Sequence, residues 1–204
     1  RTSGNAGDET GITLFAVDAS LDGVVRRAYP TVDGTRAAEI ELRDVRVAGT
    51  AKLGDVGDGF AALDATIDDA TLAICAEAVG IMHTLKDKTI EYSKNRSQFG
   101  MPLGGFQALQ HRMVDMLTAC EQAQSLLLWA AMTYQAGGTD AKRAVSAIKY
   151  LVGTAGQTVG QEAVQIHGGM GVTWDLDVAH LFKRLTTIGQ LFGNADWHLD
   201  KLAA

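Results

Sequence analysis

The chain has 204 residues, of which 47% are hydrophobic and 21% are charged, and its formal net charge is −6. This length suits one large domain or slightly more, and the hydrophobic fraction can fill a core. An acidic chain without a basic patch is not expected to bind nucleic acid. No apolar run is long enough to span a bilayer and no signal peptide is recognisable, so no membrane partner is expected.

Residues 1–58 carry patterns that are typical of β-strands. We expect strands over residues 11–18, 23–29 and 37–47, and the last alternates apolar and charged side chains as a half-buried antiparallel strand does. Three strands alone leave an apolar face uncovered, so we expect strands from a missing N-terminal part to complete the sheet. The loop-like start at Arg1, without a methionine, also suggests a fragment of a longer protein. A partial antiparallel β-barrel or sheet is therefore predicted for residues 1–58.

From Phe60 onward the hydrophobic period becomes 3.6 residues, as in amphipathic helices. The first predicted helix runs from Phe60 to about Asn95, and the second runs from about Phe106 to a stop at Gly137 and Gly138. The third begins at an N-cap at Thr139 or Asp140 and runs to about Ile166. A shorter fourth segment runs from about Asp175 towards Leu202. Long helices joined by short loops predict an up-and-down four-helix bundle over residues 59–204. The expected fold class is therefore α+β, mainly α.

Both cysteines, Cys75 and Cys120, lie inside these helical patterns. They are expected to be small core residues in a reducing compartment, not partners in a disulfide or ligands of zinc. His180 and His198 have no partner at metal-ligand spacing. No metal site is therefore expected.

The junction between the first two helices carries chemistry as well as stop signals. Arg96, Gln98 and Phe99 lie there, among glycines and a proline that end one helix before the next begins. Such a set could present a planar, hydrogen-bonding edge to an anionic ligand. It could equally be an ordinary helical hairpin whose arginine is favoured by the helix dipole.

A second candidate stretch ends the third helix at residues 164–172. It is either a glycine C-cap with a favoured histidine, or a bare backbone turn where a ligand contacts the main chain, with Gln165 and His167 as polar contacts. It is not a dinucleotide fingerprint, because it follows a helix instead of a strand and its glycine spacing differs.

Taken together, the two stretches form a specific pattern. Its members are Tyr92, Arg96, Gln98, Phe99, Gly100, Pro102, Phe106, Gln107, Gln110, Asp115, Met116, Gln165, Gly168, Gly169 and Gly171. In order and spacing, over residues 1–190, this pattern resembles the acyl-CoA dehydrogenase family, and residues 41–47 look like the end of that family's middle β-domain. The resemblance implies an absent N-terminal helical domain, the second half of a middle β-domain at 1–58 and a C-terminal bundle at 59–204. It also implies that FAD is the cofactor and that two hydrogens are removed from an acyl-CoA thioester.

Carried over position by position, the resemblance implies a set of cofactor contacts. Arg96, Gln98 and Phe99 match positions that touch the FAD of a neighbouring subunit, and Phe106 and Gln107 match a further contact. The turn that would hold the adenosine end consists of Gln165, Ile166, His167, Gly168 and Gly169. A cofactor shared in this way requires an oligomer, either of one chain or of two homologous chains.

The departures from the family pattern concern catalysis. Gly193 stands where the family's usual catalytic Glu is expected, and Ala70 stands at the alternative position on the first helix. Asp68 is close to Ala70 and is the candidate substrate contact, but each residue turns a helical side chain by roughly 100°. Ala195 and Trp197 replace the Thr and Gln that usually help to hold FAD. No catalytic base is therefore expected in this chain.

These losses suggest one subunit of a heteromeric α2β2 acyl-CoA dehydrogenase, of the kind found in bacterial steroid side-chain breakdown. It would complete the FAD site of a homologous partner that carries the Glu, and would work in the cytoplasm, or in a mitochondrial matrix, with electron-transfer flavoprotein as electron acceptor. One alternative is a non-catalytic homologue that binds flavin or acyl groups or serves assembly. Another is a relative of flavin-dependent hydroxylases or nitroalkane oxidases, with Asp69 or Asp196 as base.

Overall fold

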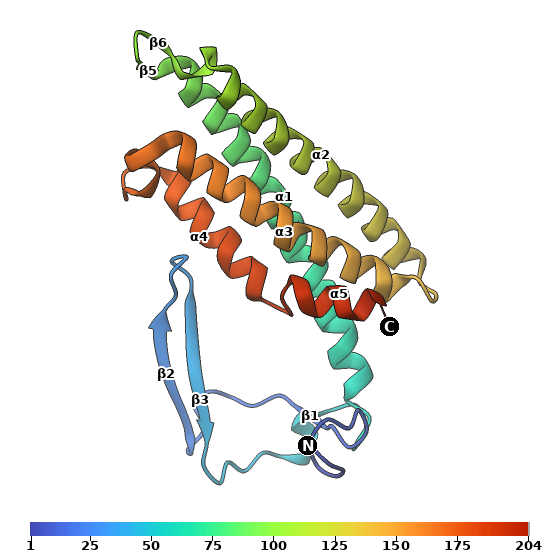
Figure 1. Ribbon diagram of the computed structural model, residues 1–204. Coiled ribbons are helices and arrows are strands. Elements are labelled where there is room, and N and C mark those ends of the chain that lie inside the picture. The colour runs from blue at the N-terminus through green and yellow to red at the C-terminus, as the bar shows by residue number, and fades with distance from the viewer. Residues whose placement is uncertain (204) are drawn as a thin grey trace. The chain divides into compact units, whose positions relative to one another are not determined.

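A computed structural model describes residues 1–203, and the chain divides into two compact units, Arg1–Ile67 and the part from Asp68 onward (Figure 1). The division falls inside the first helix, α1, which spans Phe60–Asn95. The domain boundary expected after residue 58 stays a prediction. Each unit is described by itself below.

The first unit holds two small antiparallel pairs. Its strands are β1 (Leu14–Phe15), β2 (Val24–Pro30), β3 (Arg36–Leu42) and β4 (Lys52–Leu53), with a 3-10 turn at Gly49–Ala51. β1 pairs with β4, and β2 pairs with β3 in a register that sets Arg26 opposite Ile40. The β2–β3 turn is closed by the backbone N–H of Thr31, which donates to the carbonyl of Thr35 at 3.0 Å.

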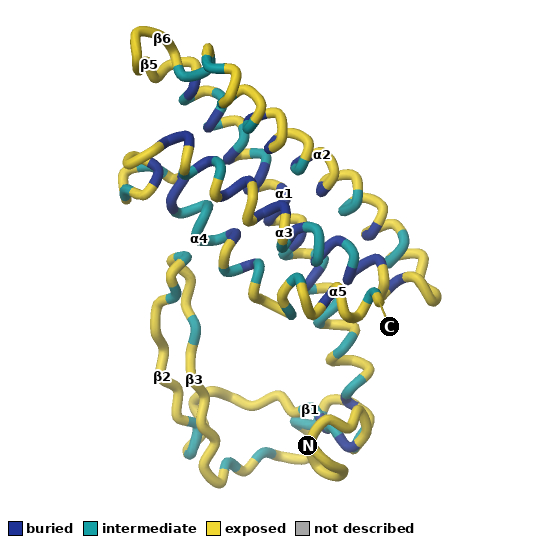
Figure 2. The backbone as a smooth tube through the Cα atoms, in the orientation of Figure 1, coloured by how far each residue is buried: buried dark blue, intermediate teal, exposed yellow. Residues whose placement is uncertain are grey.

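The prediction of a half-buried strand over residues 37–47 is wrong in two respects. β3 ends at Leu42, and it is not half-buried, because its apolar Ile40 is 65% exposed. The tube coloured by burial shows β2 and β3 as almost entirely exposed (Figure 2). The reason is that within residues 1–67 this sheet has only two strands and no second layer to cover its apolar side chains, and it closes no barrel.

The second unit is the expected helical bundle. After α1 come α2 (Gln107–Ala136), α3 (Ala141–His167), α4 (Asp177–Gln190) and α5 (Ala195–Ala203). The short strands β5 (Ser97–Gln98) and β6 (Met101–Pro102) form a hairpin between α1 and α2. α3 packs directly against α2, α4 and α5 (Figure 1). The bundle and the bounds of its three long helices are therefore confirmed.

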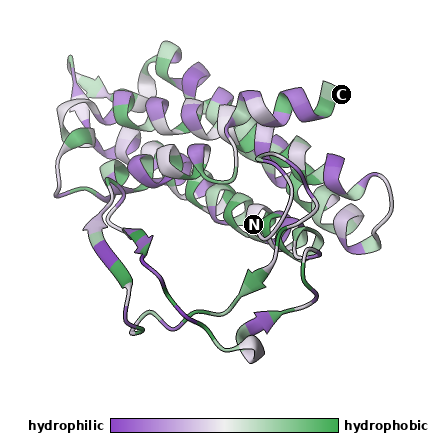
Figure 3. Ribbon diagram, turned by 90° about the horizontal axis from the view of Figure 1, so that it is seen from below, coloured by the Kyte–Doolittle hydropathy of each residue, from purple (hydrophilic) through white to green (hydrophobic). Residues whose placement is uncertain are grey.

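The core of the bundle is built from the periodic apolar residues of these helices. Met82, Met116, Ile148 and Ile188 are fully buried and come from four different helices. The helical ribbons carry both hydrophobic and hydrophilic residues, as the view coloured by hydropathy shows (Figure 3). The free cysteines belong to this core. No helix among residues 1–203 is long and apolar enough to cross a bilayer.

Two local predictions in the bundle are corrected. The last segment is not one helix, because Leu191 leaves α4 in an extended conformation and Phe192 and Gly193 have φ values of 55° and 98° before α5 begins. Asp140 does occupy the N-cap position of α3, but its side chain makes no capping hydrogen bond, since its own backbone is already helical.

Candidate functional site

The junction between α1 and α2 is a compact reversal built on backbone hydrogen bonds. The N–H of Arg96 donates to the carbonyl of Tyr92, and the N–H of Leu103 donates back to the carbonyl of Arg96, both at 2.8 Å. The β5–β6 hairpin between these bonds lies at one end of α1 and α2 (Figure 1). The guanidinium of Arg96 is exposed, so the fold leaves this cation available to a ligand.

Phe99 is held in an unusual conformation at the tip of this hairpin. Phe99 and Gly100 form a two-residue turn with φ values of 55° and 84°, and such a turn normally takes Asn, Asp or Gly at its first position. Phe99 is 92% exposed, and its ring meets that of Phe106 edge-on, with centroids 6.3 Å apart. A strained backbone that presents a bare aromatic ring is typical of a contact surface.

The end of α3 supplies open backbone. Gly168 has a φ of 62°, and its N–H donates to the carbonyl of Gln165 as the helix ends. A Cβ atom added to Gly168 or Gly169 would meet no heavy atom within 4 Å. The main chain at these glycines is therefore open to close approach by a ligand.

The two stretches, about 70 residues apart in sequence, face one cavity of about 420 Å³. It is lined by Tyr92, Arg96, Gln98, Leu103, Ile166, His167, Gly168, Gly169 and Met170. Six of the ten predicted cofactor contacts are thus brought together. Phe99, Phe106, Gln107 and Gln165 lie on the same two segments but do not line this cavity. Leu103 and Met170 were not predicted as lining residues, and no sequence signal distinguishes them from ordinary turn and helix-end residues.

His167 supports the cavity wall with its ring. His167 is 5% exposed, and its ring stacks on that of Tyr92 with centroids 4.3 Å apart, while its Nδ1–H donates to the carbonyl of Ala163 at 2.7 Å. Burial lowers the pKa of His167, although the bond to Ala163 opposes this shift. A neutral ring in this position joins the end of α3 to α1, and so fixes the glycine turn relative to Arg96.

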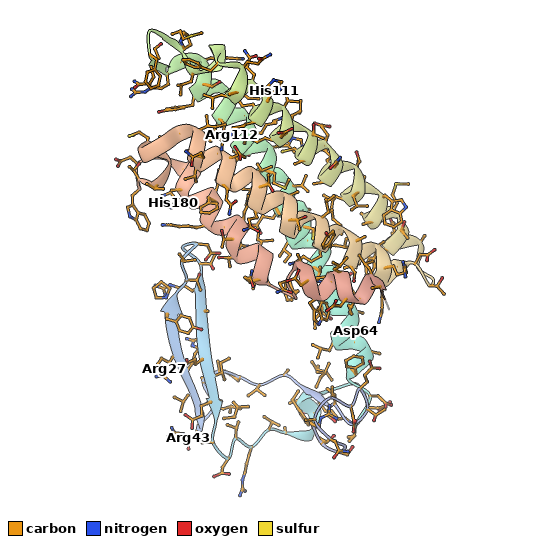
Figure 4. The ribbon with its side chains drawn as sticks, viewed as in Figure 1. Arg27, Arg43, Asp64, His111, Arg112 and His180 are labelled. Atoms are coloured by element: carbon orange, nitrogen blue, oxygen red, sulfur yellow. The ribbon has the colours of Figure 1, made fainter. Side chains whose placement is uncertain are left out.

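Two ion pairs join the helices around the cavity, and among residues 1–203 no ion pair of Arg96 is present. Lys88 forms an ion pair of 2.9 Å with Asp177 at a neighbouring cavity of about 310 Å³, which also touches Tyr92 and His167. Arg112 of α2, labelled in Figure 4, pairs with Glu162 of α3. These pairs tie α1 to α4 and α2 to α3, which holds the helix ends that shape the site.

The loop between α4 and α5 contains no carboxylate at the expected base position. Gly193 occupies it, and its carbonyl accepts a hydrogen bond of 2.7 Å from the ammonium of Lys149. Lys149 is fully buried and also donates to the carbonyl of Gly189 at 3.3 Å. Burial lowers the pKa of this lysine. Sequence reasoning missed Lys149, although its place beside Ile148 on the buried stripe of α3 was a usable signal.

The alternative base position offers no acid either. Ala70 lies on α1, partly buried, and the nearby Asp68 is about 40 Å from Arg96 along the helix, given a rise of about 1.5 Å per residue. Asp69 is exposed. Asp196 is exposed on α5 and lines a separate cavity of about 380 Å³ between α3, α4 and α5. Within the part of the chain that the structure describes, no three His, Cys, Asp or Glu residues are grouped to hold a metal ion.

Comparison with known proteins identifies the family. Residues 57–204 match the family model of the acyl-CoA dehydrogenase C-terminal domain. The acyl-CoA dehydrogenase IpdE2 of Mycolicibacterium smegmatis is 35% identical over 201 residues, which cover 97% of this chain and 59% of that protein. The chain belongs to the acyl-CoA dehydrogenase family, and it spans about two fifths to three fifths of the length of the curated relatives it matches.

Solved structures agree with this assignment. The structure named Tcur3481-Tcur3483 steroid ACAD G363A variant has a TM-score of 0.82 at 30% identity, with 94% of this chain and 50% of that chain covered. The structure of PigA with FAD and proline has a TM-score of 0.88 at 25% identity, with 96% and 51% covered. Both likenesses extend over nearly the whole of this chain.

Proposed function

We propose that this chain is a subunit of an FAD-dependent acyl-CoA dehydrogenase that completes the FAD site of a homologous partner. One observation carries the proposal. An exposed arginine and an open glycine backbone share one cavity, whereas the position of the usual catalytic acid carries no side chain at all. Groups that would serve a cofactor are kept, and the group that would take a proton from substrate is missing.

The residues present fit the cofactor. FAD has an anionic pyrophosphate and planar rings, and the cavity offers the Arg96 cation together with main chain at Gly168 and Gly169 that a ligand can approach closely. The exposed ring of Phe99 beside them offers an apolar surface for a planar group. The PigA structure, whose name includes FAD, supports the same assignment.

Each residue would have a separate task in binding. Arg96 would pair with the pyrophosphate, and Gln98 would donate or accept hydrogen bonds beside it. His167 and Tyr92 would keep the glycine turn in place without contacting charge. Phe99 would exclude water from one side of the cofactor. None of these groups transfers a proton, so their contribution is binding and orientation.

FAD, when bound, accepts a hydride from the β-carbon of the acyl thioester. The α-proton must pass to a base within hydrogen-bonding distance, and the product is the α,β-unsaturated thioester. Because neither Gly193 nor Ala70 can accept a proton, we assign the base to a Glu of the partner subunit. The name of the steroid dehydrogenase structure, which joins two designations, is consistent with such a pairing and suggests a steroid-derived acyl-CoA as substrate.

The remaining partners follow from this role. Electron-transfer flavoprotein is the proposed acceptor and would take up the two electrons that the reaction removes from the acyl thioester. The relative named caffeyl-CoA reductase-Etf complex subunit CarC has such a partner in its name. A cytoplasmic location suits a bacterial enzyme that acts on CoA thioesters.

The test is reconstitution. The full-length protein should be purified alone and after co-expression with a Glu-bearing homologue, and both samples should be assayed for flavin absorbance and for oxidation of butyryl-CoA and of a steroid-side-chain acyl-CoA with a dye as electron acceptor. Flavin and activity are expected in the co-expressed complex. Oxidation at an equal rate by the lone protein would contradict the proposal.

A non-catalytic assembly or binding role is the second candidate, favoured by the lack of a carboxylate at both base positions. It predicts a complex that contains flavin but oxidises neither thioester. The Arg96→Gln variant tests whether flavin at this cavity takes part in turnover, because weaker flavin binding should then lower the activity of the complex. Arg36→Gln, which changes an exposed arginine of β3, is the matched control.

A further inference from the structure

The backbone at Gly193 leaves no room for a side chain. Its φ is 98°, a conformation that L-residues rarely adopt. A Cβ atom placed there would lie 2.5 Å from Cε3 of Trp197 and 3.1 Å from Nε2 of His198. A side chain at position 193 would therefore be directed into the Trp197 ring.

Trp197 is held in this place by its neighbours. Its backbone N–H donates to Oδ1 of Asn194 at 2.9 Å, which fixes the start of α5. The ammonium of Lys201 lies 4.3 Å from the centroid of the ring, and the ring of His198 meets it edge-on at 4.6 Å. The ring is 46% exposed, so one side faces Gly193 while part of it faces outward.

The loop is also fixed from within the bundle. Lys149 holds the Gly193 carbonyl, and the Nε2–H of His198 donates to the carbonyl of Phe192 at 3.0 Å. The peptide groups on both sides of the Gly193 Cα are therefore restrained. The loop cannot turn the 193 side-chain direction away from Trp197 without breaking one of these two hydrogen bonds.

We propose that the ring of Trp197 occupies the space that a side chain at position 193, the place of the missing base, would need. Gly193 and Trp197 thus form a matched pair, and position 193 can accommodate a carboxylate side chain only if Trp197 is replaced as well. The inference rests on the proposed function in one respect, namely that position 193 is where this scaffold would carry a base. The closure itself is independent of that assignment. Because Trp197 fills this space, a single substitution at position 193 would not restore the acid.

The closure is tested by a double-mutant cycle on thermal stability, with Gly193→Ala, Trp197→Ala and the double variant of the full chain. We expect Gly193→Ala to lower the Tm by about 3 °C or more beyond its effect in the Trp197→Ala background. Gly137→Ala is the matched control, because Gly137 has a φ of 74° but no atom within 4 Å of an added Cβ. Its effect should be the same in both backgrounds. Equal effects of Gly193→Ala with and without Trp197 would overturn the closure.

A second measurement addresses the functional consequence. Gly193→Glu and Gly193→Glu combined with Trp197→Ala are assayed, as flavin-reconstituted full-length protein, for butyryl-CoA oxidation with a dye acceptor. The double variant should exceed the single variant by roughly 100-fold, the usual effect of a placed general base. Equal and measurable activity of the two variants would overturn the proposal. If the cycle shows coupling while neither variant oxidises the thioester, the closure stands, and the assignment of position 193 as the place of a base fails.

Discussion

The ammonium group of Lys149 donates a 2.7 Å hydrogen bond to the carbonyl of Gly193, and so joins the centre of α3 to the loop between α4 and α5. The second bond of Lys149, to Gly189, satisfies a carbonyl in the last turn of α4, where helical carbonyls lack partners within the helix. A positive charge is favoured at such a helix end. These contacts explain how the ammonium group of a fully buried lysine finds hydrogen-bond acceptors.

Lys149→Met should therefore destabilise the bundle and loosen the α4–α5 loop. The variant keeps the volume but leaves two carbonyls without a donor, which costs about 1–3 kcal/mol and lowers the Tm by roughly 4–10 °C. Lys94→Met changes an exposed lysine on α1 and is the control, with little change expected. A Tm for Lys149→Met equal to that of the wild type would show that the loop does not depend on this cation.

Protonation of His198 at acidic pH should lower the stability of the same α4–α5 region. Burial is the main cause that lowers the pKa of His198 from 6.5 to about 4, and its buried Nδ1 has no hydrogen-bond partner among residues 1–203. Because the unfolded chain binds this proton at a higher pH than the folded chain, the stability from the neutral ring is fully present above pH 6.5 and is lost as the pH falls towards about 4.

The measurement is the Tm between pH 4 and pH 7, a range that brackets the His198 transition. His198→Gln keeps a donor for the Phe192 carbonyl and cannot take up a proton, so its Tm should fall less steeply with acid than that of the wild type. His111→Gln, at an exposed position on α2 (Figure 4), should leave the slope unchanged. Parallel slopes for all three proteins would assign the acid response to other groups.

Arg96→Gln should weaken FAD binding without harming the fold. The guanidinium is exposed, so its loss leaves no buried group unpaired. A charge-assisted hydrogen bond contributes about 1.5–3 kcal/mol, which corresponds to a loss of affinity of roughly 10-fold to 150-fold. Flavin fluorescence titration of the reconstituted complex measures this, with far-UV circular dichroism as a check on folding. Unchanged affinity would remove Arg96 from the proposed site.

Phe99→Gly should have opposite effects on stability and on binding. Glycine adopts a φ of 55° without strain, so the Tm should stay equal or rise by the equivalent of up to about 1 kcal/mol. Loss of the exposed ring should at the same time lower flavin retention or assembly with the partner, read by absorbance and by size-exclusion chromatography. A variant that is more stable and binds equally well would mean that the ring serves neither.

Much of the bundle could be predicted because its helices are long and periodic. The stripe through Phe60 and Ile90 gave the extent of α1, and Gly137 marked the end of α2. The break after Gln190 could not be predicted, because it depends on two positive φ values that are held by contacts with Lys149 and His198. The contact of Lys149 joins residues 44 apart in sequence, and the contact of His198 depends on where α5 begins.

Part of the candidate cavity was foreseen from the sequence. The family resemblance associates Arg96 with the Gly168 turn, and both line one cavity. The strained turn at Phe99 was not foreseen, because Phe is an uncommon choice for a positive φ. The prediction that β3 is half-buried was wrong, because alternation of apolar and charged residues indicates which face of a strand is apolar but not whether anything covers that face.

The reactivity of the two thiols of the bundle measures how often the bundle opens. Cys75 and Cys120 are both 0% exposed, and burial raises their pKa values to about 12 and about 11, so almost no thiolate forms at neutral pH. An alkylating reagent can reach either sulfur only when the helices separate. The rate of alkylation, followed by mass spectrometry, therefore reports how often α1 and α2 part from the core, and no engineered label is required.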